Sequence, residues 1–401
     1  ANLSEYANKE NDELIQKAIF LSRAKKGPVH INAPFEEPLY NVVSNFTYTP
    51  FIVQDQENIL EESELVSFEK LLNTPKIIIL IGCQNVTTIS QENINFLAEQ
   101  SNIVILTEIN SNVHHNKIVS NIDTLITNFS DDDFNRFQPE ILITFGGMIV
   151  SKRVKSMFRN YKPKEHWHVD ELRAYDTFSA LTHHYKTSPN NFIEQLKNVF
   201  TSTVSNFSSE IQIIMNERLK RHLSYMELIP FSDLKTFDLI WKKLPKNTHL
   251  QISNSAVIRY AQLFKTDDTV DVYCNRGTSG IDGSTSTSIG AATAHHKPTL
   301  FITGDISFFY DSNALWNNYI PKNYKIIIVN NSGGGIFRIL PGHKETSTFN
   351  TYFETQHNLT AEHLANMYNF QYLKATCEME LNTALNLLFT NIFLILYEVL
   401  V

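Results

Sequence analysis

Residues 299–341, TLFITGDISFFYDSNALWNNYIPKNYKIIIVNNSGGGIFRILP, constrain the fold of this 401-residue chain more than any other stretch. Two short apolar runs, 299–303 and 325–329, predict buried parallel strands, and the residues between them predict a short helix over 311–318. In such a strand–helix–strand unit the helix crosses one face of the sheet. The stretch therefore predicts an α/β protein built on doubly wound, mostly parallel sheets.

Polar residues follow both predicted strands. Asp305 comes after the first strand and Asn331 after the second, 26 positions later. The carboxyl ends of parallel strands form the ligand-binding edge of an α/β sheet, so both oxygens could reach one Mg²⁺ ion. Gly333 and Gly334 can offer a carbonyl to the metal and N–H groups to phosphate. The alternative is that Asp305 and Asp311 cap turns and the glycines only end a strand.

This motif resembles the diphosphate motif of thiamin diphosphate (ThDP) enzymes. The variant GDISFFYD…VNNSGGGIF is similar to the 2-succinyl-5-enolpyruvyl-6-hydroxy-3-cyclohexene-1-carboxylate synthase family of menaquinone biosynthesis. Most ThDP enzymes have a third glycine after Gly-Asp, whereas Ile306 stands there in this chain. That departure favours the synthase family. The resemblance implies a transferase that uses ThDP with Mg²⁺, or alternatively Mn²⁺.

The resemblance continues in SNSAVIR (253–259) and NRGTSGIDG (275–283), and it implies a set of site residues. The implied metal ligands are Asp305, Asn331 and Gly333. The cofactor-binding residues implied are Asn254, Ser255, Ser279, Gly280, Ile281, Asp305, Ile306, Ser307, Asn331, Gly333, Gly334 and Ile336. The substrate-binding residues implied are Lys152, Arg153, Arg259, Arg276, Phe337 and Leu340. By position, Ile281 resembles the apolar residue that props thiamin into its bent shape.

Each of these residues also has a structural interpretation. Ser253 to Ser255 precede an apparent helix over 252–264 and are typical helix caps. The Lys152–Arg153 pair is typical of a solvated helix face, and Arg276 lies in a Gly-rich turn. Phe337 and its apolar neighbours are typical of a hydrophobic core. The same helix start also aims N–H groups at an anion, and Arg276 is well placed for a bidentate carboxylate contact.

The family's reaction decarboxylates 2-oxoglutarate and adds the product to isochorismate, and the organic step belongs to the cofactor. Both substrates carry two carboxylates. This explains why an acidic protein would direct several basic residues into one cleft. Which basic residue binds which substrate does not follow from the sequence. The assignment that we favour gives Arg259 and Arg276 to 2-oxoglutarate, and Lys152 and Arg153 to isochorismate.

We expect three segments along the chain. Residues 1–40, with a helix over 11–26 and a strand within 27–40, resemble the end of a pyrimidine-binding (PYR) domain. Residues 41–200, with strands at 77–82, 103–107, 141–147 and 166–170, predict a doubly wound middle domain of the transhydrogenase-III-like type. Residues 201–401 are expected to form the diphosphate-binding domain.

The family's catalytic glutamate belongs to the PYR domain, so we expect no catalytic residue in these 401 residues and no activity from them alone. The cofactor in this family lies between two subunits. The resemblance therefore implies a homo-oligomer, a dimer or a tetramer.

Composition excludes several other classes. The net charge is −8 without a Lys/Arg-rich block, which argues against nucleic-acid binding. The sequence contains no run of eighteen apolar residues of the kind that inserts into a membrane, and its first residues lack an apolar signal core. A cytoplasmic protein is therefore expected. Three cysteines far apart, without a CxxC pair, argue against a disulfide scaffold or a zinc site.

Three other functions are alternatives to that of the synthase family. Another ThDP-dependent 2-oxo acid decarboxylase or carboligase would be expected to show Gly-Asp-Gly and a neutral substrate pocket. A non-catalytic phosphate-binding module could use the same fold. A dinucleotide site is disfavoured, because GGMIVSKR (146–153) lacks the GxGxxG spacing.

Overall fold

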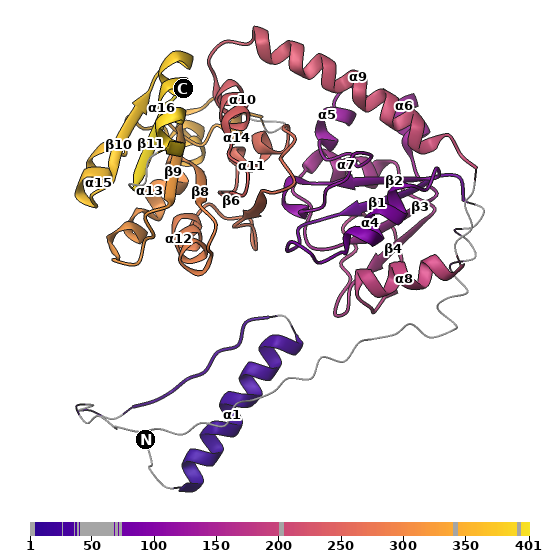
Figure 1. Ribbon diagram of the computed structural model, residues 1–401, viewed down its shortest axis with the longest axis horizontal. Coiled ribbons are helices and arrows are strands. Elements are labelled where there is room, and N and C mark those ends of the chain that lie inside the picture. The colour runs from indigo at the N-terminus through magenta and orange to yellow at the C-terminus, as the bar shows by residue number, and fades with distance from the viewer. Residues whose placement is uncertain are drawn as a thin grey trace.

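The structure is a computed structural model, and it describes residues 5–25, 27–35, 37, 40, 68, 71, 74–199, 204–339, 344–390 and 394–401. These residues contain two parallel sheets flanked by helices (Figure 1). The predicted fold class is confirmed. Among the described helices, none combines the length and the apolar character that a membrane span requires.

The first sheet has five parallel strands in the order β2-β1-β3-β4-β5. They are β1 (Ile77–Ile81), β2 (Ile103–Thr107), β3 (Ile141–Phe145), β4 (Glu165–Val169) and β5 (Leu181–Tyr185). The first three strands are buried at every position, and their alternate side chains enter two hydrophobic clusters, one on each face. The helices around the sheet are α4 (Gln91–Ala98), α5 (Ile122–Ile126), α6 (Asp131–Phe137), α7 (Lys152–Asn160) and α8 (Pro189–Val199).

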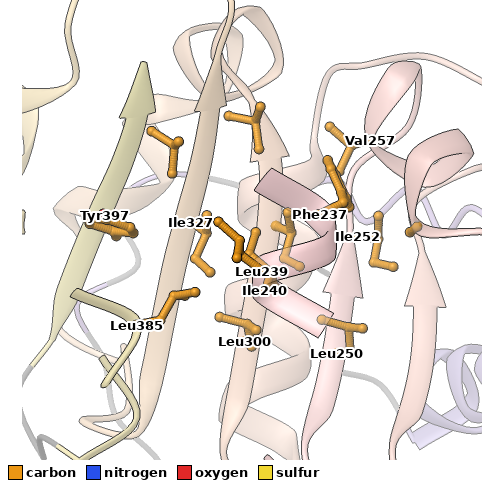
Figure 2. Packing of buried hydrophobic residues seen from close by; sticks show 14 of the residues in the cluster. Phe237, Leu239, Ile240, Leu250, Ile252, Val257, Leu300, Ile327, Leu385 and Tyr397 are labelled. Carbon is orange, nitrogen blue, oxygen red and sulfur yellow. The ribbon is translucent and has the colours of Figure 1, made fainter. Parts of the chain in front are cut away.

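The second sheet has six parallel strands in the order β10-β11-β9-β8-β6-β7. They are β6 (His249–Ile252), β7 (Asp271–Cys274), β8 (Thr299–Gly304), β9 (Tyr324–Asn330), β10 (Gln371–Ala375) and β11 (Ile395–Leu400). One face packs against α10 (Asp233–Lys243), α11 (Ala256–Ala261) and α16 (Glu378–Thr390). The other packs against α12 (Ser284–Ala294), α13 (Asp305–Tyr310) and α15 (Glu362–Met367). Figure 2 shows side chains of α10 over the strands of the first of these faces.

Each sheet has a switch point, where consecutive connections leave to opposite sides. In the first sheet β2 and β3 flank β1, and in the second sheet β7 and β8 flank β6. The crevice beyond the carboxyl ends of the strands at a switch point is the usual ligand site of such sheets. In the second sheet this crevice lies between the ends of β6 and β8.

The two sheets are joined near that crevice by the segments that follow β2 and β3. Ile109 and Val150 of the first unit pack into a hydrophobic cluster of the second sheet. The Asn112 side chain exchanges two hydrogen bonds with the backbone of Val272, at 2.8 and 3.0 Å, and so pairs with the edge strand β7. These contacts bring α7, which begins two residues after Val150, toward the second sheet.

Several predicted elements differ from the structure. The short helix predicted over 311–318 is present in part, as the 3₁₀ helix η3 (Ser312–Trp316). It is preceded by α13, which was not predicted and begins directly at the end of β8. The helix predicted over 252–264 is only α11, because its first residue ends β6. The N-terminal helix is α1 (Glu5–Ala24), and the described residues 27–35 form no strand. β5 was not predicted because its sequence, LTHHY, is mostly polar.

Candidate functional site

A cavity of about 620 Å³ lies at the carboxyl ends of β6, β8 and β9, at the switch point of the second sheet. All twelve residues predicted to bind the cofactor line it: Asn254, Ser255, Ser279, Gly280, Ile281, Asp305, Ile306, Ser307, Asn331, Gly333, Gly334 and Ile336. Of the predicted substrate-binding residues, Lys152, Arg259, Arg276 and Phe337 line it as well. Arg153 does not line this cavity, and Leu340 lies outside the described residues.

Asp305 is the most buried acidic group of the cavity, with 3% of its surface exposed. Its Oδ1 accepts from the Ile306 N–H at 2.7 Å, and its Oδ2 accepts from the Gly333 N–H at 3.0 Å. His357 Nε2 lies 3.2 Å from the same Oδ2. Burial raises the pKa of Asp305, and the Ile306 hydrogen bond and His357 oppose that rise. A cation at this carboxylate would relieve the cost of burying its charge.

Asn331 is oriented by a residue that the sequence did not indicate. Its Nδ2 donates to Asp233 Oδ2 at 2.8 Å, and Asp233 lines the same cavity from the start of α10. Because Nδ2 is directed at Asp233, the Asn331 side-chain oxygen points away from Asp233 and stays available to a ligand. Burial raises the pKa of Asp233, and its Oδ1 is buried without a hydrogen-bond partner. Such an atom indicates a polar ligand or water.

Gly333 and Gly334 are required by close approach of the chain itself. A Cβ at Gly333 would lie 2.9 Å from the Glu354 carbonyl oxygen, and one at Gly334 would lie 3.2 Å from that of Phe353. Both neighbours belong to the π-helical turn η4 (Phe349–Glu354). The Gly334 N–H donates to the Glu354 carbonyl at 2.5 Å. The two glycines therefore allow η4 to pack against the end of β9. They would also allow the backbone to approach a ligand closely.

The loop after β7 is held at the cavity by side-chain hydrogen bonds. Asn254 Nδ2 donates to the Ser279 carbonyl and, at 3.0 Å, to the Gly280 carbonyl. Ser307 Oγ donates to the Ile281 carbonyl at 2.6 Å. The two hydrogen-bonding groups come from the ends of β6 and β8, so the loop that carries Ile281 is held at both sides of the switch point.

Ser255 precedes α11 but makes no side-chain capping bond to it, and its backbone has φ 74° and ψ −131°. Ser279 also has a positive φ, 66°. Non-glycine residues in such conformations are strained, and strained residues gather at functional sites. The capping interpretation of Ser255 is therefore wrong.

Four basic side chains line the cavity: Lys152, Lys155, Arg259 and Arg276. One Arg276 nitrogen donates to Asn254 Oδ1, and its Nε is buried without a partner. Burial, followed by the repulsion of Arg276, lowers the pKa of both Arg259 and Lys155. Like charges this close are mutually unfavourable and would be stabilised by an anionic ligand.

Lys155 was missed from the sequence, although it lies three residues after Lys152 and hence on the same face of α7. That spacing could have indicated it. Its Nζ donates to the Ile149 carbonyl at 3.0 Å. Arg153, by contrast, donates to Thr127 Oγ1 at 2.8 Å, which directs it toward the C-terminal end of α5.

The start of α7 is held by a buried carboxyl group. Glu108 accepts from the backbone N–H groups of Val150 and Ser151 at 2.6 and 2.7 Å. Burial is the main cause that raises its pKa to about 7, and these two hydrogen bonds oppose the rise. Glu108 thus fixes the helix that presents Lys152 and Lys155 to the cavity.

Comparison with known proteins agrees with this geometry. Residues 47–252 match the family model described as the middle domain of thiamine pyrophosphate, and residues 254–395 match the C-terminal TPP-binding domain of thiamine pyrophosphate enzymes. Thiamine pyrophosphate is ThDP. The two matches meet beside the cavity, with Lys152 and Lys155 in the first and the Asp305–Asn331 pair in the second. The fold and the cavity thus define a ThDP-dependent enzyme.

Curated relatives narrow this class. The chain is 56% identical over 382 residues to the 2-succinyl-5-enolpyruvyl-6-hydroxy-3-cyclohexene-1-carboxylate synthase of Flavobacterium psychrophilum, which covers 95% of this chain and 70% of that protein. It is 53% identical over 396 residues to the synthase of Flavobacterium johnsoniae, covering 98% and 71% of the two chains. The synthase of Porphyromonas gingivalis is 33% identical over 403 residues, covering 96% and 68%. The chain belongs to this synthase family, whose enzymes are of the transferase or carboligase type.

Proposed function

We propose that the protein decarboxylates 2-oxoglutarate and adds the resulting succinic semialdehyde unit to isochorismate, with ThDP and Mg²⁺ or Mn²⁺, in menaquinone biosynthesis. The observation that carries this proposal is the convergence of four basic side chains on one cavity: Lys152, Lys155, Arg259 and Arg276. Both substrates have two carboxylates. Guanidinium and ammonium groups bind carboxylates through strong, directional hydrogen bonds.

The cation would be held by the Asp305 carboxylate, the Asn331 side-chain oxygen and the Gly333 carbonyl. These are hard oxygen ligands of the kind that Mg²⁺ prefers, with phosphate and water filling the remaining positions. When bound, ThDP supplies a thiazolium group that stabilises the carbanion left by decarboxylation. Asn254, Ser255, Ser279, Gly280, Ser307 and Gly334 would position the cofactor, and Ile281, Ile306 and Ile336 would pack against it.

The substrates would be divided between the two sides of the cavity. Arg259 and Arg276, which follow β6 and β7, would bind 2-oxoglutarate. Lys152, joined by Lys155 from the same face of α7, would bind isochorismate. Phe337 lines the cavity and packs edge-on against Phe353 at 5.9 Å between ring centroids. These rings would exclude water from the reacting groups.

Two architectural expectations belong to the same proposal. Residues 41–200 would be the middle domain and residues 201–401 the diphosphate-binding domain. The active protein would be a homo-oligomer, at least a dimer.

Another ThDP-dependent decarboxylase or carboligase is the competing function. An enzyme for a neutral acceptor has no need of four basic side chains in its cavity. The repulsion among three of them, Lys155, Arg259 and Arg276, supports the dicarboxylate substrates.

The test has two stages with the full-length protein. First, ThDP and Mg²⁺ are titrated calorimetrically into the wild type and into Asp305→Ala. Saturable, magnesium-dependent binding that the substitution abolishes supports the proposed cradle. Second, consumption of isochorismate is followed with either 2-oxoglutarate or pyruvate as donor. Isochorismate should be consumed with 2-oxoglutarate as donor and not with pyruvate. A preference for pyruvate would contradict the proposed substrates.

A further inference from the structure

Three potential metal ligands gather at the edge of the second sheet opposite the cavity. His249 and Asp271 are the first residues of β6 and β7 and are direct partners in the sheet register. His295 follows α12, where the chain turns back toward β8. One ligand atom from each of these side chains lies within 4.8 Å of the other two. The sheet register and the end of α12 thus bring two imidazoles and one carboxylate together.

His249 is the most deeply buried member of the cluster, with 4% of its surface exposed. Its Nε2 lies 2.7 Å from the side-chain amide of Gln251, whereas its Nδ1 is buried and has no hydrogen-bond partner. A half-turn of the amide lets the Gln251 oxygen accept from Nε2–H, which leaves the Nδ1 lone pair for a ligand. A carbonyl oxygen that accepts from the outer nitrogen is the usual companion of a metal-bound histidine.

Lys297 supplies the positive charge that balances this cluster in the present structure. Its Nζ donates to Asp271 Oδ2 at 2.6 Å, and its backbone N–H donates to His295 Nδ1 at 3.2 Å. A divalent cation would compete with the ammonium group for the carboxylate. His295 would lose its hydrogen bond from the Lys297 N–H whichever nitrogen binds the metal. If Nδ1 binds the metal, its lone pair is occupied, and if Nε2 binds it, the neutral ring carries its proton on Nδ1.

We propose that His249, Asp271 and His295 bind one Zn²⁺ ion, with water completing a tetrahedral set. Two imidazoles and one carboxylate favour Zn²⁺ over Mg²⁺, which prefers an all-oxygen octahedron. The ion would join β6, β7 and the chain entering β8. It is separate from the cofactor cation, because Thr299, the register partner of His249, lies six residues, about 20 Å of extended strand, before Asp305.

The test is a calorimetric titration of zinc chloride into the tag-free full-length protein, with ThDP and Mg²⁺ in excess. The expected result is one zinc ion per chain that excess Mg²⁺ does not displace. His295→Ala changes a half-buried side chain outside the sheet. It is expected to weaken zinc binding by about 100-fold, because loss of a ligand should cost at least as much affinity as loss of a residue behind a ligand. His296→Ala, its exposed neighbour, is the matched control and should bind like the wild type.

Lys297→Met gives a second, opposite readout. Removing the ammonium group leaves Asp271 to the metal, so zinc should bind about tenfold more tightly than to the wild type, in line with the typical effect of outer-shell groups. Cobalt(II) should show the strong visible absorption of a tetrahedral site in the wild type and not in His295→Ala. Absence of zinc binding in both the wild type and Lys297→Met, or equal binding by the wild type and His295→Ala, would overturn the proposal.

Discussion

The two sheets have the same doubly wound design, but the switch point is closed in the first sheet and open in the second. In the first sheet the loops after β1 and β3 touch: a Cβ added to Gly82 would lie 2.1 Å from the Gly147 carbonyl oxygen, and the Gly147 N–H donates to Cys83 at 2.7 Å. In the second sheet the corresponding loops diverge, and the cavity of about 620 Å³ lies between them. Shared topology therefore locates a possible site, and the packing of the loops decides whether one exists.

The open switch point is kept open by its own hydrogen bonds. Asn254 leaves the end of β6 and binds the loop after β7, while Ser307 holds the same loop from the side of β8. The first sheet instead contributes through Glu108 at the end of β2, which fixes the helix that carries Lys155. One sheet holds the candidate site and the other presents basic groups to it.

The largest expected effect is on the closed switch point. Gly82→Ala should cost about 3 kcal/mol of unfolding free energy, because the new methyl group overlaps the backbone at Gly147. Gly304→Ala, at the open switch point, meets only Val257 Cγ2 at 3.7 Å and should change stability by less than about 0.5 kcal/mol. Urea denaturation of both variants measures this difference. Equal losses would mean that the two switch points do not differ in packing.

An effect of similar size is expected on pH dependence. The folded-state pKa of Glu108, about 7, lies above the ordinary value of 4.5, so the unfolded chain binds fewer protons between these pH values. The stabilisation is fully present below pH 4.5 and is lost as the pH rises through 7, a change of about 3 kcal/mol. Glu108→Gln should lack this decline, as urea denaturation at pH 4.5, 6 and 7 would show. Parallel curves for the two proteins would rule out a raised pKa.

A smaller effect is expected from Asp233, which positions Asn331. Asp233→Ala frees the carboxamide to rotate and should weaken magnesium-dependent ThDP binding by about 10- to 100-fold, as changes behind a metal ligand do. Asp233→Asn keeps an oxygen that can accept from Asn331 and should restore most of the affinity. Calorimetry measures both. Weak binding by both variants would assign Asp233 a direct role through its charge.

The smallest effect concerns the two neighbouring basic residues of α7. Lys155→Met should raise the KM for isochorismate by about tenfold with little change in kcat, because uniform substrate binding is lost. Arg153→Met should leave KM within about twofold of the wild type, since its guanidinium is directed at Thr127. Steady-state kinetics separates the two, and the reverse order would restore Arg153 as the substrate ligand.

The sequence predicted the parts of the site that depend on short-range pattern. Asp305 and Asn331 each follow an apolar strand, and parallel strands bring their ends to one edge. Asp233 could not be found this way, because it meets Asn331 across 98 positions. The short helix predicted over 311–318 is present in part, as the 3₁₀ helix η3, while the side chain of Asp311, before its start, accepts from Ser286 at the start of α12. The cysteine spacing, finally, carried no information about His249 and His295, which the start of β6 and the end of α12 bring together.

Ser255 limits how this protein can be stabilised by sequence change. Its positive φ suits glycine, so Ser255→Gly would relieve backbone strain and is a substitution that a search for heat resistance should favour. The same change would remove a hydroxyl group from the wall of the candidate site. Selection for durability and selection for turnover would therefore act in opposite directions on this one codon.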